Sequence, residues 1–179
     1  HKPVPAIIDT IQKEGLTVNV FGLVFELPND LLSGIQVADA RRIFKPEDEL
    51  FLNIIEFNPD KQQVKLSNIG TSSDPKEYIE AVVNESKIYE CIIERFSTDK
   101  QGTQSGLQVS TKELKSWIFI PKNKATTSRF LDLKTKFAVN QPIQVTIDHY
   151  SPISSNFIGT LNNLIDPWKN GVARKIKNG

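Results

Sequence analysis

The sequence is poor in cysteine, histidine and methionine, and it lacks long hydrophobic runs. Its single cysteine, Cys91, excludes an intramolecular disulfide framework and fits a reducing compartment, so we expect a cytoplasmic protein. No apolar run approaches the roughly 18–20 residues of a transmembrane helix, so we expect no association with a membrane. The N-terminal residues include Pro3, Pro5, Asp9 and Glu14, which excludes the apolar core of a signal peptide at that place.

Motifs of the common catalytic sites are missing as well. The histidines are His1 and His149, no Cys/His cluster has the spacing of zinc ligands, and neither a phosphate-binding loop nor a dinucleotide fingerprint occurs. We interpret Asp148-His149-Tyr150 as polar residues at the end of a strand. We therefore expect no enzyme, no metal, no cofactor and no small-molecule substrate. Because methionine is absent and position 1 is His, we expect the sequence to be part of a longer protein.

The residues that are plentiful indicate a globular β protein. The 179 residues include 22 Lys and Arg against 21 Asp and Glu, and 39% of them are hydrophobic. This hydrophobic content, with a net charge of only +1, excludes a disordered chain. Ten Phe, ten Pro and nine Gly, together with many Ile, Val and Thr, favour strands joined by turns over helices.

An internal repeat divides the sequence into two similar halves. The first half contains Ala6-Ile7-Ile8-Asp9 and then Gly15-Leu16-Thr17-Val18, where the second half has Cys91-Ile92-Ile93-Glu94 and then Gly106-Leu107-Gln108-Val109. Further matches follow in the same order: Val24-Phe25-Glu26-Leu27-Pro28 with Trp117-Ile118-Phe119-Ile120-Pro121, Phe44 with Phe137, Leu50, Leu52 and Ile54 with Ile143, Val145 and Ile147, Phe57-Asn58-Pro59 with Tyr150-Ser151-Pro152, and Asp74-Pro75 with Asp166-Pro167. The shared order predicts two copies of one domain.

Each copy has the pattern of a small β domain. Apolar residues alternate with polar ones in several short segments, which predicts half-buried strands. Turn residues at 58–61 and 150–152 separate the last two strands, and a weakly helical stretch is expected over 30–39. Five short strands with turns predict a Greek-key barrel of the OB type in each copy.

The segment between the copies predicts a short helix. Asp74-Pro75-Lys76-Glu77 has the residue types of a helix start, and Ile79, Val82 and Val83 then follow with helical spacing. The predicted fold is therefore all-β, with two tandem five-stranded OB-fold barrels joined by a short helix. The expected domains are a first repeat at 1–75, a helical linker at 76–86, a second repeat at 87–168, and a basic tail at 169–179 that is either a linker or the start of a third repeat.

The repeated pattern resembles the S-one RNA-binding domain, the OB-fold repeat of the large ribosomal protein of that name. The resemblance lies in Gly-Leu-x-Val, in the aromatic-Ile-Pro element that follows, in the opening of strand four and in the closing Asp166-Pro167-Trp168. A competing register would align Phe21-Gly22-Leu23-Val24 and Gly34-Ile35-Gln36-Val37-Ala38 with two other elements of that family. The internal repeat contradicts this competing register, which would also leave strand one at the wrong distance from the elements that follow. We therefore prefer the alignment that the internal repeat gives.

The resemblance implies that single-stranded nucleic acid binds the outer face of strands two and three. In the second copy Ile118 and Ile120 alternate with Trp117 and Phe119. If the β-branched pair faces the core, both aromatic rings face outward beside Gln108 and Ser110 on strand two. We expect these rings to stack on bases, although burial against a neighbouring surface is the alternative role for them.

The first copy differs at the same positions, where Val24 and Glu26 are expected outside and Phe25 and Leu27 inside. A carboxylate there repels phosphate, so we expect the first repeat to be a degenerate RNA binder. Residues 1–75 have seven basic and eleven acidic side chains, a net charge of −4, whereas residues 87–168 have ten and seven, a net charge of +3. This contrast favours the second copy as the one that contacts nucleic acid.

The expected function is non-specific binding of single-stranded RNA by the second barrel, within a cytoplasmic protein of translation or RNA metabolism. The residues predicted to contact RNA are Trp117, Phe119, Gln108, Lys100, Lys122, Lys124 and Arg129. The alternative is a protein–protein docking module in which nucleic-acid binding is lost, with a protein partner bound through the acidic first repeat.

Overall fold

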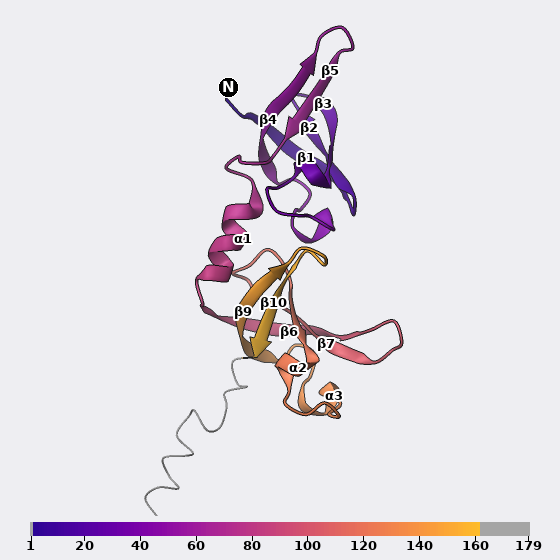
Figure 1. Cartoon of the computed structure of the whole chain (residues 1–179), viewed down its shortest axis with the longest axis vertical. Coiled ribbons are helices and arrows are strands. Elements are labelled where there is room, and N and C mark those ends of the chain that lie inside the picture. The colour runs from indigo at the N-terminus through magenta and orange to yellow at the C-terminus, as the bar shows by residue number, and fades with distance from the viewer. Residues whose placement is uncertain (1, 162–179) are drawn as a thin grey trace, which may run out of the picture. The chain divides into compact units, whose positions relative to one another are not determined.

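The computed structural model describes residues 2–161, which form mostly strands with a few short helices (Figure 1). The strands are β1 (Val4–Gln12), β2 (Gly15–Val20), β3 (Leu23–Pro28), β4 (Glu49–Asn58), β5 (Gln63–Ser67), β6 (Ile88–Thr98), β7 (Gln104–Ser110), β8 (Ile118–Pro121), β9 (Pro142–Ser151) and β10 (Asn156–Leu161). The helices are η1 (Asn29–Leu31), η2 (Ala40–Arg42), α1 (Pro75–Asn84), α2 (Lys122–Ala125) and α3 (Leu133–Lys136). The predicted tail at 169–179 and the Asp166-Pro167-Trp168 motif lie outside the described residues.

The described chain divides into two compact units. The first contains residues 2–85 with 150–156, and the second contains residues 86–149 with 157–161. The strand order of the first sheet is β3-β2-β1-β4-β5, and the second sheet is a closed barrel with the order β10-β8-β7-β6-β9. Because the second sheet is closed, its order can also be read as β8-β7-β6-β9-β10, which corresponds strand by strand to the order of the first sheet. The prediction of a mostly-β protein with two five-stranded barrel-like sheets is therefore confirmed.

Strand registers confirm the alignment of the internal repeat. In the first unit Ile8 lies opposite Val18. In the second unit Ile93, which matches Ile8 in the repeat, lies opposite Val109. The other matched pairs are Leu16–Leu27 with Leu107–Ile120, Gly15–Pro28 with Gly106–Pro121, and Ala6–Leu50 with Cys91–Ile143. Both first strands also have a register irregularity directly after these isoleucines.

The core of each unit follows the period-2 alternation of its strands. In the first unit Leu16, Val18 and Leu27 are buried, and in the second unit Leu107 and Ile120 are fully buried. Each such side chain contributes about 1.5–3 kcal/mol to folding when it leaves water. Cys91 also belongs to a core strand, where burial, followed by the charges of nearby carboxylates, raises the pKa of its thiol to about 12.

The two sheets differ in how they close. In the second unit β10 pairs in parallel with β8, where Phe157 lies opposite Ile118 and Ile158 opposite Phe119. In the first unit β3 and β5 are the outer strands of the sheet and are not paired with each other. A closed barrel was predicted for both copies, and among the described residues only the second sheet is closed by hydrogen bonds along its whole circumference.

Helix α1 lies where the sequence predicts the linker helix. The side chain of Asp74 accepts a hydrogen bond from the backbone N–H of Lys76 at 3.0 Å and so caps the N-terminus. Ile79 and Val82 are buried, and Val83 is half-buried, as the apolar spacing predicts. The start signal and the apolar stripe of this helix are therefore both confirmed.

Asp74 also joins this helix to two loops of the first unit. Its carboxylate accepts hydrogen bonds from Ser33 Oγ at 2.5 Å, from the N–H of Gly34 at 3.0 Å and from the N–H of Gly70 at 2.8 Å. Burial would raise the pKa of this carboxyl, but the hydrogen bonds from Ser33, Gly70, Lys76 and Gly34 together outweigh it and lower the pKa below the ordinary 3.8. The folded unit therefore favours the ionised form.

We expect Asp74→Asn to lower the free energy of unfolding of the first unit by about 1–3 kcal/mol at pH 7, because an amide cannot accept all of these hydrogen bonds. The wild-type contribution is present above the ordinary carboxyl pKa of 3.8 and is lost as the pH falls through the lower folded-state value. Urea unfolding followed by far-ultraviolet circular dichroism should thus give a smaller difference between the two proteins at pH 3 than at pH 7. Asp60→Asn, at an exposed turn, is the control, and an equal difference at both pH values would contradict the assignment.

Candidate nucleic-acid interface

The second unit presents two aromatic rings around strand β8. Ile118 and Ile120 are fully buried, whereas the side chain of Trp117 is 46% exposed and that of Phe119 is half-buried. The predicted orientation of this segment is therefore confirmed, and the role of the two rings in binding stays a prediction. We call Trp117 and Phe119 the aromatic platform.

A row of side chains crosses three strands beside the platform. Gln108 on β7 lies opposite Phe119 on β8, and Arg95 on β6 lies opposite Gln108. Gly106, one row further along β7, leaves room for the ring, since a Cβ atom there would lie 2.9 Å from Phe119 Cε2 and 2.1 Å from the carbonyl oxygen of Ile120. The glycine that the repeat places at this position therefore lets the Phe119 ring lie close to the sheet.

Gln108 lies on the predicted face but is only 5% exposed. Its Oε1 atom accepts a hydrogen bond from Arg95 Nε. Ser110 is half-buried, and its hydroxyl donates to a carboxylate oxygen of Glu94. Gln108 and Ser110 thus each hold a charged side chain of β6, and the contact of Gln108 with nucleic acid stays a prediction.

The four predicted cations lie in different segments of the second unit. Lys100 is exposed in the turn between β6 and β7, and Arg129 is exposed between α2 and α3. Lys122 is half-buried in the first turn after β8. Lys124 forms an ion pair with Asp148 on β9, which also accepts a hydrogen bond from Thr160 Oγ1 at 2.8 Å. The charge of Lys124 is therefore partly neutralised.

Gln104 connects the start of β7 to helix α3. Its Nε2 donates to Asp132 Oδ1 at 2.6 Å, and its Oε1 accepts from the N–H of Leu133 at 2.7 Å. The hydrogen bond from the backbone of Lys134, and then that from Gln104, lower the pKa of Asp132. Lys134 Nζ lies 6.0 Å from the centre of the Phe96 ring. This corner of the unit was not foreseen from the sequence.

Arg95 is the residue of this surface that sequence reasoning missed. Its guanidinium carbon lies 5.5 Å from the centre of the Trp117 ring, within the range of a cation–π contact. Simple alternation from buried Ile93 would turn Arg95 toward the core, but the register irregularity between these two residues turns it outward. The first copy has a matching irregularity between Ile8 and Thr10, after an identical Ile-Ile pair, but the sequence alone shows neither irregularity.

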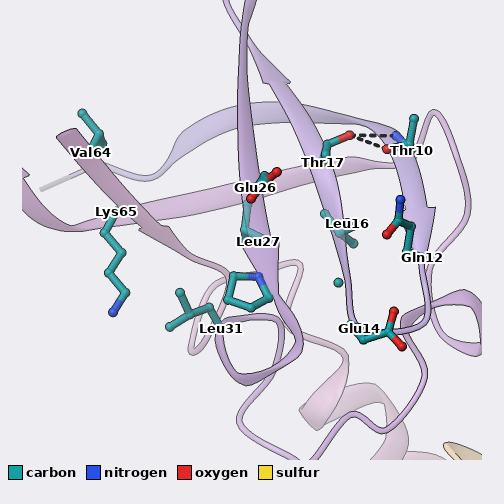
Figure 2. A pocket seen from close by; sticks show the side chains of 12 residues that line it. Thr10, Gln12, Glu14, Leu16, Thr17, Glu26, Leu27, Leu31, Val64 and Lys65 are labelled. Carbon is teal, nitrogen blue, oxygen red and sulfur yellow. Dashed lines mark hydrogen bonds between the residues drawn. The ribbon is translucent and has the colours of Figure 1, made fainter. Parts of the chain in front are cut away.

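The first unit has a different surface at the equivalent positions. There Thr10, Thr17 and Glu26 occupy the row that Arg95, Gln108 and Phe119 occupy in the second unit. Figure 2 shows Thr10 and Thr17 side by side. Their hydroxyl oxygens are hydrogen-bonded at 2.6 Å. Exposed Glu26 stands where the second unit has an aromatic ring, as predicted.

This row of the first unit borders a groove of about 450 Å³. The lining residues are Thr10, Gln12, Glu14, Gly15, Leu16, Thr17, Glu26, Leu27, Pro28, Leu31, Val64 and Lys65. The groove has two carboxylates against one ammonium group, which disfavours a phosphate backbone. Its charge and its lack of aromatic rings distinguish it from the platform of the second unit.

Within residues 2–161, no cluster of three or more His, Cys, Asp or Glu side chains is arranged to hold a metal ion. No helix in that range has the length and apolar character needed to cross a membrane.

Comparison with known proteins shows similarity to solved structures. No family model and no curated protein matches the sequence. Among solved structures, the chain is similar to a multidomain protein with nucleic acid binding domains from Streptococcus pneumoniae, with a TM-score of 0.33 and 12% sequence identity. The alignment covers 98% of this chain and 57% of that chain, so this chain spans little more than half the length of that structure.

Proposed function

We propose that the second unit binds single-stranded RNA across the outer face of β6, β7 and β8, as an S-one-type OB-fold domain in a longer cytoplasmic protein of RNA metabolism or translation. The observation that carries this proposal is the aromatic platform, where exposed Trp117 and half-buried Phe119 flank the buried Ile118. Base stacking on such rings contributes about 1–3 kcal/mol per base. The chain acts in this proposal as a binding module and not as an enzyme.

Unpaired cations among the described residues of the second unit also support the proposal. Lys100, Lys122 and Arg129 are three cations without an ion pair among the described residues, and they belong to three segments of the same unit. Phosphate groups along a bound strand could contact them while bases stack on Trp117 and Phe119. Such contacts position the strand without reading its sequence, so the platform and these cations supply affinity rather than specificity.

Salt dependence tests this proposal directly. With two or three phosphate contacts, the affinity for a labelled single-stranded oligonucleotide should fall about 7- to 20-fold between 50 mM and 200 mM salt, because each contact releases counterions. Fluorescence anisotropy with an oligouridylate 12-mer measures this change. Absence of binding at the lower salt concentration would reject the proposal.

A second candidate function is protein docking through the first unit. The observation that favours it is the large apolar exposure of this unit, where Phe21 is 85% exposed and Phe57 is 66% exposed. Leu23 and Val24 are exposed beside Phe21 in sequence, and neighbouring apolar side chains of this kind commonly mark an interaction surface. The first unit would then bind a protein partner, whether or not the second unit binds RNA.

A further inference from the structure

Arg95 is held in one place by two neighbours on the outer face of the second unit. Its Nε–H donates to Gln108 Oε1, and its guanidinium carbon lies 5.5 Å from the centre of the Trp117 ring. The outward turn of β6 before Arg95 brings the side chain to this position. A guanidinium restrained in this way loses little conformational freedom when it binds a ligand.

The terminal N–H groups of Arg95 remain for a ligand. Its Nε–H is used by Gln108, and no ion pair among residues 2–161 includes Arg95. Two parallel N–H donors of a guanidinium match two acceptors on one edge of a partner. Two such partners occur in a nucleic acid, namely a phosphate group and the guanine edge formed by O6 and N7.

Glu94 favours the base over the phosphate. Its side chain is exposed, lies next to Arg95 in sequence and accepts a hydrogen bond from Ser110 on the strand beside it. A carboxylate at this place repels a phosphate group but accepts hydrogen bonds from N–H donors of a base. Guanine has both kinds of group, because O6 and N7 accept while N1–H and the exocyclic amine donate.

On the edge that carries O6 and N7 in guanine, the other bases do not match this pair of side chains. Adenine combines one acceptor, N7, with a donor at N6 on the same edge, and each pyrimidine offers a single group there. On this edge, a fixed pair of guanidinium donors is therefore satisfied fully only by guanine. The adjacent Trp117 ring provides the surface on which the same base, or its neighbour, can stack.

We propose that Arg95, held by Gln108 and Trp117, selects guanine in a single-stranded RNA bound to the outer face of β6–β8. This inference rests on the proposed function, to which it adds a base preference. The phosphate contacts of Lys100, Lys122 and Arg129 stay independent of sequence, so one guanine read by Arg95 determines the preferred register of the strand.

The test uses nine-nucleotide oligouridylates with one central guanosine, adenosine or 7-deazaguanosine, titrated by fluorescence anisotropy. The guanosine oligomer should bind about 5- to 100-fold more tightly than the adenosine oligomer. The 7-deaza oligomer, which lacks only the N7 acceptor, should lose most of this advantage. Arg95→Lys keeps the charge but removes the paired donors, so it should bring the three affinities close together while circular dichroism stays unchanged.

Lys122→Ala is the matched control, since it should weaken all three oligomers by the same factor. Equal binding of the guanosine and adenosine oligomers by the wild-type chain would overturn the guanine inference and leave the proposed function intact. A guanosine preference that survives Arg95→Lys would assign the selection to another residue. Absence of binding to every oligomer would overturn both the inference and the proposed function.

Discussion

Replacing both Trp117 and Phe119 by alanine is expected to weaken binding of single-stranded RNA by about 30- to 1000-fold, which corresponds to about 2–4 kcal/mol. Each ring offers a face to one base, and the lower part of the usual range applies because Phe119 is half-buried before any ligand binds. The fold should persist, since the core of β8 consists of Ile118 and Ile120, which are fully buried and unchanged.

Anisotropy titration of the wild-type and doubly substituted chains with an oligouridylate 12-mer measures this loss. The matched control is Val24→Ala combined with Glu26→Ala, which changes the equivalent positions of the first unit. These positions are exposed but not aromatic, so the control should bind RNA like the wild type. An unchanged affinity in the Trp117/Phe119 variant would exclude the aromatic platform as the binding surface.

Phe157→Ala is expected to cost the second unit about 3–5 kcal/mol of its free energy of unfolding. Phe157 is fully buried and lies opposite Ile118 in the parallel pair that closes the barrel. Its backbone N–H also donates to the carbonyl oxygen of Trp117 at 3.3 Å. A cavity at this position therefore loosens the strand pair beside the platform, and affinity for RNA should fall together with stability.

The emission of Trp117 reports this unfolding once the other tryptophan is removed by Trp168→Phe. Guanidinium titration in that background gives the stability of the second unit. Phe130→Ala is the control, because the Phe130 side chain is 99% exposed and its loss should change stability by less than about 0.5 kcal/mol. Similar costs for Phe157→Ala and Phe130→Ala would mean that Phe157 does not support the barrel.

The repeat and the period-2 alternation were the informative parts of the sequence. Two weak copies aligned in one order predicted strand partners in both units, such as the match of Ile8–Val18 with Ile93–Val109. Alternation also placed Ile118 and Ile120 inside and Trp117 outside. These features are local and periodic, so a single sequence is enough to detect them.

Features that depend on contacts between strands were not predictable in the same way. Outward-facing Arg95 depends on an irregularity in β6, and alternation alone assigns it to the wrong face. The ion pair of Lys124 with Asp148 joins residues that are far apart in sequence. Both copies have the same strand pattern in sequence. This pattern therefore does not show that β3 and β5 stay unpaired while the corresponding β8 and β10 pair with each other.

The parallel pair of β8 and β10 has a consequence for how the chain is made. All strands of the first sheet precede residue 68, so the ribosome releases the whole sheet early in synthesis. Strand β8 receives its second neighbour only when residues 156–161 leave the exit tunnel, because β10 is the final strand of the barrel. A nascent chain should therefore gain RNA affinity late and in one step, and a chain truncated before Asn156 should lack it.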